Sequence, residues 1–195
     1  MQLKDSKTKE NLLRAFAGES QARNRYDISA AQAKKDGLYV LESLFKYTGN
    51  QEKEHAEVFY SQLKEFAGTN IDISAGYPLD TYDSTLKLLQ AANHNEMEEH
   101  DVVYKNFSDV AKEEGFQVIS NIFSNIASIE KIHGERFLRY ATELENGTLF
   151  KKDTDVRWIC TNCGFIYEGK EAPKICPVCQ HPQGYFLLFE NSTFE

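Results

Sequence analysis

The sequence predicts a mainly α-helical fold, a four-helix bundle followed by a small metal-binding β module. Two observations predict it. Proline is absent from 5–67 and from 83–146, as long uninterrupted helices require. All four cysteines lie in two Cys-x-x-Cys pairs near the C-terminus. With 195 residues, the chain can hold one medium domain and one small domain.

The proline-free stretches divide into four helices. Gly37 and Gly115 fall at matching places in the two halves, and glycine commonly ends a helix at a turn. We therefore expect helices at 5–35, 38–67, 83–113 and 116–146. The segment 68–82 is a longer connection, as in bundles whose second and third helices are joined by a crossover.

The expected helices repeat one pattern of carboxylates and imidazoles. Two Glu-x-x-His motifs lie 78 residues apart, and each follows a further glutamate, one of which lies 77 residues after the other. The repeated residues are Glu19, Glu52 and His55 in the first half and Glu96, Glu130 and His133 in the second. Four helices that supply four carboxylates and two imidazoles are typical of ferritin-like di-iron bundles.

These residues interrupt the apolar faces of the helices. On the second helix, for example, Phe45, Glu52, His55 and Phe59 recur at helical spacing. A lone Glu-x-x-His motif is more often a solvated acid beside a satisfied histidine. Two matched copies on core faces favour metal binding, because unpaired buried carboxylates cost several kcal/mol. Oxygen-rich ligands with one imidazole per ion suit iron or manganese better than structural zinc.

The third helix breaks the symmetry of the two halves. Glu99 lies on its inward face, whereas the matching place in the first half is Ala22. One ion therefore has an extra candidate carboxylate, which could alternate with His55 between two oxidation states. Tyr26 and Tyr104 are either core aromatics or hydrogen-bond donors to ligands. We expect the remaining nearby acids and histidines to be solvated, and these are Glu54, Glu57, Glu98, His94 and His100.

The cysteines form a second metal motif, Cys160-x2-Cys163-x12-Cys176-x2-Cys179. Four thiolates bind iron or zinc, and the spacing alone leaves that choice open. The neighbouring di-metal bundle favours iron, because a redox site can use a one-electron centre and gains nothing from structural zinc.

Charge and composition exclude some classes of protein. The net charge of −8 argues against nucleic-acid binding, which needs a basic face. No apolar run approaches membrane length, and the N-terminus does not resemble a signal peptide. We therefore expect a cytoplasmic protein with no membrane partner, in which clustered cysteines bind metal rather than form disulfides.

Several long segments resemble the rubrerythrin family. They are FAGESQARNRY (16–26), QAKKDG (32–37), QEKEH (51–55), IEKIHGERF (129–137), WICTNCGFIYEG and CPVC. The resemblance covers nearly the whole chain. It implies a ferritin-like di-iron bundle over 1–147, a linker over 148–156 and a rubredoxin-like iron module over 157–195.

The resemblance also implies a site and an activity. The di-iron ligands would be Glu19, Glu52, His55, Glu96, Glu99, Glu130 and His133, with His55 exchanging for Glu99 on reduction. Glu19, Glu52, His55, Glu99, Tyr26 and Tyr104 would take part in catalysis, and Cys160, Cys163, Cys176 and Cys179 would bind one iron. The expected activity is reduction of hydrogen peroxide in oxidative stress defence. Electrons would come from NAD(P)H through a separate reductase or a rubredoxin, and the protein would be a homodimer or a larger homo-oligomer.

Two other functions remain open at this stage. Ferritin-like iron oxidation or storage would use the same bundle, but storage needs no electron-accepting module. A binding or sensing protein with structural zinc in the tail is the third possibility, and a visible spectrum would distinguish it, because zinc is colourless.

Overall fold

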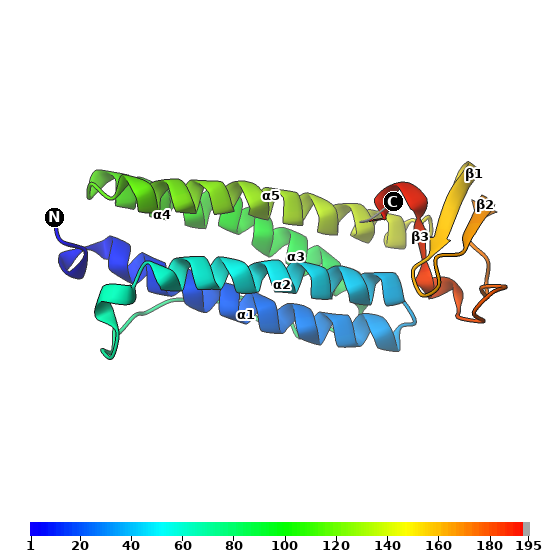
Figure 1. Ribbon diagram of the computed structural model, residues 1–195, viewed down its shortest axis with the longest axis horizontal. Helices are drawn as coiled ribbons and strands as arrows, with labels where there is room; N and C mark the ends of the chain where they lie inside the picture. The colour runs from blue at the N-terminus through cyan, green and yellow to red at the C-terminus, as the bar shows by residue number, and fades with distance from the viewer. Residues whose placement is uncertain (193–195) are drawn as a thin grey trace.

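The computed structural model describes residues 1–192 and shows a long helical bundle with a small sheet at one end (Figure 1). The bundle contains α1 (Lys7–Lys35), α2 (Tyr39–Ser61), α3 (Thr85–Glu98), α4 (Tyr104–Glu113) and α5 (Gln117–Glu145). A π-helical turn, η3 (Glu99–Val103), joins α3 to α4, so the two run on as one interrupted helix. The predicted four-helix bundle is confirmed, with α3, η3 and α4 forming its third helix.

The helix boundaries differ from the prediction in two places. Residues 83–113 form two α-helices and a π turn rather than one continuous helix. The second helix ends at Ser61 rather than near 67, because its last turn tightens into bonds from Gln62 N–H to Phe59 O and from Leu63 N–H to Tyr60 O. The turn η2 (Lys64–Phe66) follows.

The bundle consists of two helical hairpins, one formed by α1 and α2 and the other by α3, α4 and α5. A carboxylate in the turn of each hairpin caps a helix of the other. Glu114, in the turn between α4 and α5, accepts hydrogen bonds from the backbone N–H groups of Lys7 and Thr8, both at 2.9 Å. Asp36, in the turn between α1 and α2, accepts from Thr85 N–H at 3.2 Å and from the Thr85 hydroxyl at 2.6 Å. Each carboxylate satisfies free N–H groups at the start of a helix in the other hairpin.

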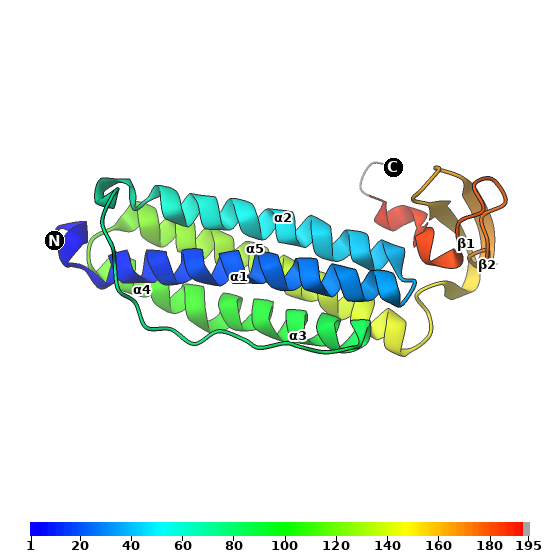
Figure 2. The same cartoon turned by 90° about the horizontal axis from the view of Figure 1, so that it is seen from below.

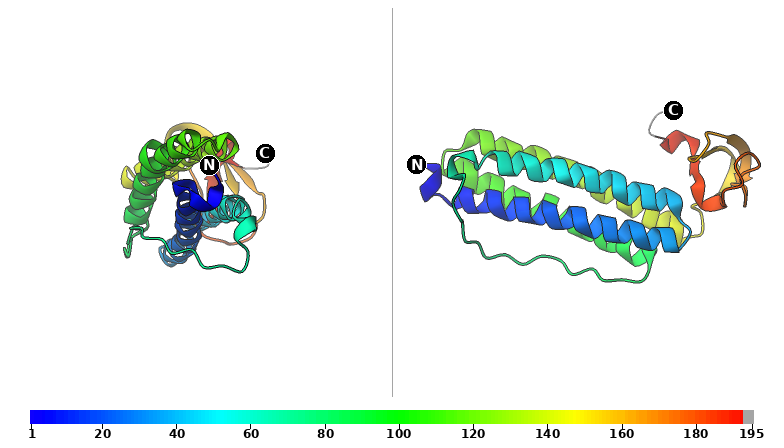
Figure 3. Two further views of the ribbon diagram at one scale, coloured as in Figure 1. Left: turned by 90° about the vertical axis from the view of Figure 1, so that its left-hand side faces the viewer. Right: turned by 60° about the horizontal axis from the view of Figure 1, so that its bottom comes forward.

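The segment between η2 and α3 has no regular structure and runs along the outside of the bundle (Figures 2 and 3). It connects one end of α2 to the opposite end of the bundle, where α3 begins. This is the crossover that the sequence predicts. Within residues 1–192, none of the helices combines the length and the apolar character needed to cross a membrane.

The C-terminal module is a three-stranded antiparallel sheet in the order β2-β1-β3. Its strands are β1 (Lys151–Cys160), β2 (Ile166–Glu171) and β3 (Phe186–Leu188), followed by η5 (Phe189–Asn191). β1 begins inside the predicted linker 148–156, because Lys151 already pairs with Glu171. The domain boundaries themselves stay a prediction.

The module packs on the end of the bundle beside the turn between α1 and α2. The rings of Tyr39 on α2 and Tyr185 on η4 (Gln183–Tyr185) are stacked, with centroids 4.1 Å apart. Gly184 packs so closely that a Cβ atom there would lie 1.8 Å from the carbonyl oxygen of Gly37. Only glycine fits at position 184 without moving the module.

Candidate metal centres

Two groups of acidic and imidazole side chains meet in the middle of the bundle. One contains Glu19, Glu52, His55 and Glu130, and the other contains Glu52, Glu96, Glu130 and His133. In each group one ligand atom per residue lies within 4.8 Å of the others. Every one of these six residues is buried.

Glu52 and Glu130 belong to both groups. The Nδ1 atom of His55 lies 3.1 Å from Glu52 Oε2 and 3.0 Å from Glu130 Oε1. The Nδ1 atom of His133 lies 2.9 Å from Glu52 Oε1 and 3.0 Å from Glu130 Oε2. Each carboxylate therefore presents one oxygen to each histidine, which is the arrangement of two bridging carboxylates between a pair of ions.

Each group has one further carboxylate of its own. Glu19 Oε2 lies 3.8 Å from the Nδ1 atom of His55, and Glu96 Oε2 lies 3.6 Å from the Nδ1 atom of His133. The two imidazole rings face one another across the site, with centroids 5.7 Å apart. Glu19 and Glu96 thus take equivalent places on opposite sides.

The buried polar atoms of this site lack protein hydrogen-bond partners. The unpartnered atoms are Glu19 Oε2, Glu52 Oε1, Glu96 Oε2, both carboxylate oxygens of Glu130 and His133 Nδ1. Burial raises the pKa of Glu19 and of Glu96 well above the ordinary value, and the neighbouring carboxylates raise it further. Divalent cations would neutralise these groups and satisfy their free lone pairs, so the donor set fits a pair of metal ions.

Two tyrosine hydroxyls donate hydrogen bonds to Glu19 and Glu96, the carboxylates that each belong to only one of the two groups. The hydroxyl of Tyr104 donates to Glu19 Oε1 at 2.5 Å, and the hydroxyl of Tyr26 donates to Glu96 Oε1. Burial, followed by the charge of the adjacent carboxylate, raises the pKa of both phenols well above 10. Both phenols therefore stay protonated. Of the two interpretations that the sequence allows, Tyr26 and Tyr104 are hydrogen-bond donors to candidate ligands rather than core aromatics alone.

The two histidines differ in the hydrogen bonding of the ring nitrogen Nε2. The Nε2 atom of His133 lies 3.1 Å from Gln51 Oε1, and Gln51 in turn accepts from Arg136 at 3.2 Å. A histidine that donates Nε2–H to such an acceptor keeps its Nδ1 lone pair free for a metal. Within residues 1–192, His55 has close partners at Nδ1 alone.

Glu99 lies outside both groups. It begins the π turn and is only half-buried. Burial, and then the charge of Glu96, raises the pKa of Glu99 well above the ordinary value. The structure thus gathers six of the seven predicted di-iron ligands and places the seventh beside them.

The side chains that we expected to be solvated behave as predicted with one exception. Glu54, Glu57, Glu98 and His94 are exposed. His100 is half-buried, and its Nδ1 atom lies 2.7 Å from the carbonyl oxygen of Ala127 on α5. The prediction for His100 is wrong, because the π turn brings this side chain against α5.

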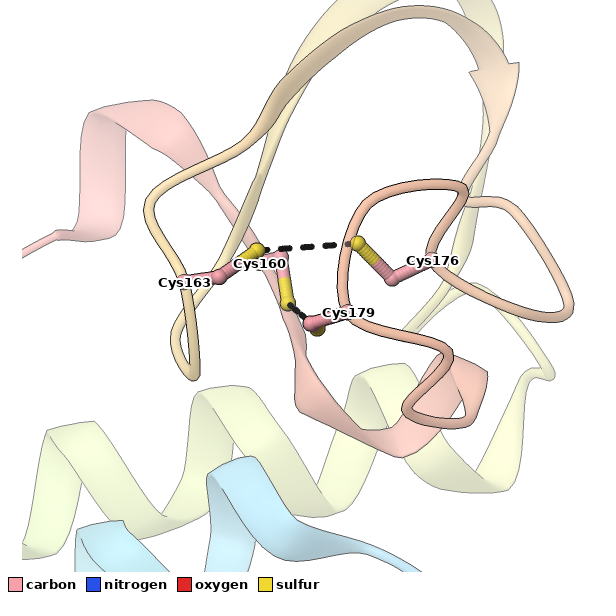
Figure 4. Close-up of side chains that lie close together, drawn as sticks. All are labelled: Cys160, Cys163, Cys176 and Cys179. Atoms are coloured by element: carbon pink, nitrogen blue, oxygen red, sulfur yellow. Dashed lines mark hydrogen bonds between the residues drawn. The ribbon is translucent and has the colours of Figure 1, made fainter.

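The four cysteines converge between two loops of the C-terminal module (Figure 4). The Sγ atoms of Cys160 and Cys179 lie 3.7 Å apart, as do those of Cys163 and Cys176. A tetrahedron with metal–sulfur bonds of about 2.3 Å has edges of about 3.8 Å. The spacing therefore fits one metal ion bound by four thiolates, and none of these cysteines forms a disulfide.

The thiolate site is buried on one side and open on the other. Cys160 and Cys176 are buried, Cys163 is exposed and Cys179 is half-buried. A hydrogen bond from the backbone N–H of His181 lowers the pKa of Cys179 to about 6. The thiolate site therefore reaches the surface of the module at Cys163.

Known proteins share this combination of sites. Residues 10–141 match the family model described as rubrerythrin, and residues 158–187 match the one described as rubrerythrin, rubredoxin-like domain. The chain belongs to the rubrerythrin family. It therefore carries a ferritin-like di-iron site, formed by the Glu/His cluster, and a four-cysteine rubredoxin-like site.

Individual rubrerythrins and solved structures agree with this assignment. The chain is 45% identical to the rubrerythrin of Clostridium perfringens over 97% of this chain and 98% of that protein. It is 40% identical to the rubrerythrin of Nitratidesulfovibrio vulgaris, over 95% and 96%. The fully reduced, all-ferrous state of nigerythrin superposes with a TM-score of 0.63 at 28% identity, over 95% of this chain and 90% of that one.

Proposed function

We propose that the protein is a non-haem di-iron peroxidase that reduces hydrogen peroxide to water in oxidative stress defence. The observation that carries the proposal is the pairing of two sites in one chain. Glu52 and Glu130 belong to both ligand groups of the bundle, and the same chain carries a thiolate site that suits one-electron transfer.

The contacts support a specific ligand assignment. Glu19 and His55 would bind one ion, Glu96 and His133 the other, and Glu52 and Glu130 would bridge both. When bound, two ferrous ions supply the two electrons that, with two protons, convert hydrogen peroxide to two water molecules. The hydroxyls of Tyr26 and Tyr104 orient Glu96 and Glu19 by donating to the oxygen of each that faces away from the cluster.

Glu99 is the proposed seventh ligand, which exchanges with His55. In this structure His55 faces the bridging carboxylates and Glu99 lies outside the cluster. His55 lacks the second hydrogen-bond partner that Gln51 provides to His133, which makes it the easier imidazole to displace. A hard carboxylate favours ferric iron and neutral imidazole tolerates ferrous iron, so this arrangement suits the reduced state.

Electrons would reach the di-iron cluster through the iron bound by Cys160, Cys163, Cys176 and Cys179. We propose an NAD(P)H-linked reductase or a rubredoxin as donor, acting in the cytoplasm. Tyr39, where the module docks, lies 13 residues before Glu52 on α2, which is about 20 Å along the helix. A homodimer or larger assembly that brings a module beside a neighbouring bundle would shorten this distance.

The proposal is tested by anaerobic stopped-flow oxidation of the chemically reduced full-length protein. We expect oxidation of the di-iron site by hydrogen peroxide to be much faster than oxidation by dioxygen. Faster reaction with dioxygen would favour iron oxidation or storage instead. A colourless thiolate site in the isolated protein would favour structural zinc.

The role of the module is tested separately with Cys160→Ser. This variant should keep single-turnover oxidation of the chemically reduced di-iron site and lose turnover driven by a reductase. Turnover that survives the loss of the tail iron would show that electrons enter elsewhere.

A further inference from the structure

The crossover forms a strap over one side of the di-iron cluster. We define the strap as residues 74–80 of this crossover, which Figure 2 shows running along the outside of the bundle. Arg14 on α1 donates from Nε to the carbonyl oxygen of Ser74 at 3.1 Å, and the Tyr77 hydroxyl donates to the Arg14 carbonyl at 3.0 Å. Asn95 on α3 donates to Asp80 at 2.8 Å. These bonds fix both ends of the strap to the bundle.

A cavity of about 150 Å³ lies under the strap. Its outer wall is 75–78 of the strap. Its floor includes Gly18 of α1 and Glu99 and Tyr104 of the third helix. The cavity therefore lies between the strap and two residues of the proposed reaction site.

The burial of the candidate ligands indicates the direction of approach. The six residues of the two metal groups expose at most 7% of their surface, whereas Glu99 is half-buried. Glu99 is thus the candidate ligand with an open side, and that side faces the cavity.

Gly18 and Tyr77 face one another across the cavity. Gly18 carries no side chain, and a Cβ atom there would lie 3.5 Å from Cε1 of Tyr77. Larger side chains at position 18 would therefore fill the space between α1 and the Tyr77 ring. Removal of the Tyr77 ring, on the strap side, would instead widen the cavity.

We propose that this cavity is the route by which peroxide reaches the di-iron cluster, and that Tyr77 limits the size of the substrate. The inference rests on the proposed peroxidase function and adds a substrate class, hydrogen peroxide and small hydroperoxides. An engineered apolar cavity of about 150 Å³ accommodates one benzene molecule. Cumene hydroperoxide carries a phenyl ring, two methyl groups and the hydroperoxide on one further carbon, and so exceeds this space.

Two variants change the route in opposite directions. In anaerobic stopped-flow experiments on the reduced holoprotein, Gly18→Val should slow oxidation by hydrogen peroxide roughly tenfold. Tyr77→Ala should raise the rate with cumene hydroperoxide, relative to hydrogen peroxide, by roughly tenfold. Tyr77→Ala lies outside the helices, so it remains informative if Gly18→Val does not fold.

Two control variants distinguish the effect of the Tyr77 ring from the effect of disturbing the strap. Tyr77→Phe keeps the ring and loses only the bond to Arg14, and it should keep the wild-type preference. Leu79→Ala changes a strap side chain that is 83% exposed and does not line the cavity. It should react with both peroxides at wild-type rates.

A second readout does not depend on turnover. Azide binding to the diferric protein reports access of a small anion to the iron. A change in the route alters the association and dissociation rates of azide by the same factor and leaves its dissociation constant unchanged. We expect this pattern for Gly18→Val, with both rates reduced, and for Tyr77→Ala, with both rates raised.

The outcomes separate this inference from the proposed function. If the wild type fails to react with peroxide while the azide rates follow the expected pattern, the peroxidase function is wrong and the route stands. Unchanged azide rates and an unchanged peroxide preference in both variants would overturn the route. A changed azide dissociation constant with unchanged association would also overturn it, because the residue would then act on the site itself.

Discussion

The two halves of the bundle share a ligand pattern but differ by one inserted residue. Glu96 lies 77 residues after Glu19, whereas Tyr104 lies 78 residues after Tyr26. The extra residue falls between Glu96 and Tyr104, the stretch that contains the π turn η3. A π turn holds one residue more than an α turn, so a single inserted residue accounts for it.

The π turn changes the position of one carboxylate. Ala22 on the continuous helix α1 is buried, whereas Glu99 at the matching place is half-buried and faces the cavity under the strap. His100, in the same turn, bonds to the carbonyl oxygen of Ala127 on α5. The comparison teaches that the shared residues form the two metal-ligand groups, while the second half adds Glu99 on an irregular turn beside them, where we propose that it exchanges with His55.

A second difference concerns the histidines. Gln51 holds His133, and the residue that matches Gln51 in the second half is Ile129, which cannot accept a hydrogen bond. If Glu99 exchanges with His55 as proposed, the extra carboxylate of the third helix and the missing acceptor at position 129 would both affect the same ion, the one between Glu19 and His55.

The largest expected effect is a loss of iron binding, at Glu52 and Glu130, the equivalent glutamates of the two halves. Glu52→Ala and Glu130→Ala should each abolish binding of both bundle irons, because each carboxylate lies within 3.1 Å of both histidines and would bridge both ions. Metal analysis of the full-length protein measures this, and the visible spectrum of the tetrathiolate iron should be unchanged. Glu54→Ala, at an exposed position on the same helix, is the matched control. Two bundle irons retained in either core variant would contradict the bridging assignment.

Removal of the inserted residue should remove the difference between the halves. Deletion of Asp101, an exposed residue of the π turn, should restore α-helical register and fix Glu99 at the buried position that Ala22 has. Both irons should still bind, but oxidation by hydrogen peroxide should slow roughly tenfold, because the exchange that we propose for Glu99 would be blocked.

The matched control for the deletion is Asp101→Ala, which keeps the chain length and should react at the wild-type rate. Wild-type kinetics in the deletion variant would show that the π turn has no role in the reaction.

The histidine asymmetry can be reversed by two substitutions. Gln51→Leu should weaken binding of the ion beside His133 by roughly 10- to 100-fold, the usual effect of losing such a partner. Ile129→Gln should give His55 the acceptor it lacks and slow its displacement. Ferrous titration measures the first change, and stopped-flow oxidation measures the second. Equal affinity of both ions in Gln51→Leu would contradict the anchoring role of Gln51.

The smallest expected effect is a change in folding stability at Glu114 and Asp36, the carboxylates with which the two hairpins cap one another. Partial burial raises the pKa of Glu114, but hydrogen bonds from Thr8 and Lys7 outweigh it and leave the pKa below the ordinary value. The carboxylate therefore stabilises the fold above its ordinary pKa, and that stability is lost as the pH falls through the lowered one. Glu114→Gln should cost about 1 kcal/mol at pH 7.

Urea unfolding of wild type and Glu114→Gln measures the cap. The difference in unfolding free energy should shrink below about pH 4, where the carboxyl group becomes protonated. Asp36→Asn, the equivalent change in the first hairpin, should cost a similar amount at pH 7. A pH-independent difference for Glu114→Gln would mean that charge has no part in the cap.

The sequence predicts the bundle and the metal residues because both depend on local periodicity. Glu52 and His55 lie three residues apart on an apolar face, and any regular helix brings them together. The cysteine pairs have the same property, since their spacing places two thiolates in each loop. Thiolate spacing alone also fits zinc, so the sequence favours iron only through the neighbouring di-metal bundle and the family resemblance.

The features that the sequence does not predict depend on single residues or on distant contacts. Hydrophobic periodicity cannot resolve one extra residue in a helix, so η3 was not expected. The change of repeat offset from 77 at Glu96 to 78 at Tyr104 is the signal that could have found it. The reciprocal caps and the Tyr39–Tyr185 stack join residues more than 45 positions apart, and no local pattern encodes them.

A redox titration of Glu99→Ala tests the central claim most directly. If Glu99 binds the oxidised cluster in place of His55, its loss removes a hard anionic ligand that stabilises the ferric state. The di-iron potential should rise and oxidation by hydrogen peroxide should slow, while ferrous loading and the potential of the tetrathiolate iron stay the same. An unchanged di-iron potential with unchanged peroxide kinetics would contradict the claim and would leave the inserted turn without a role in the reaction.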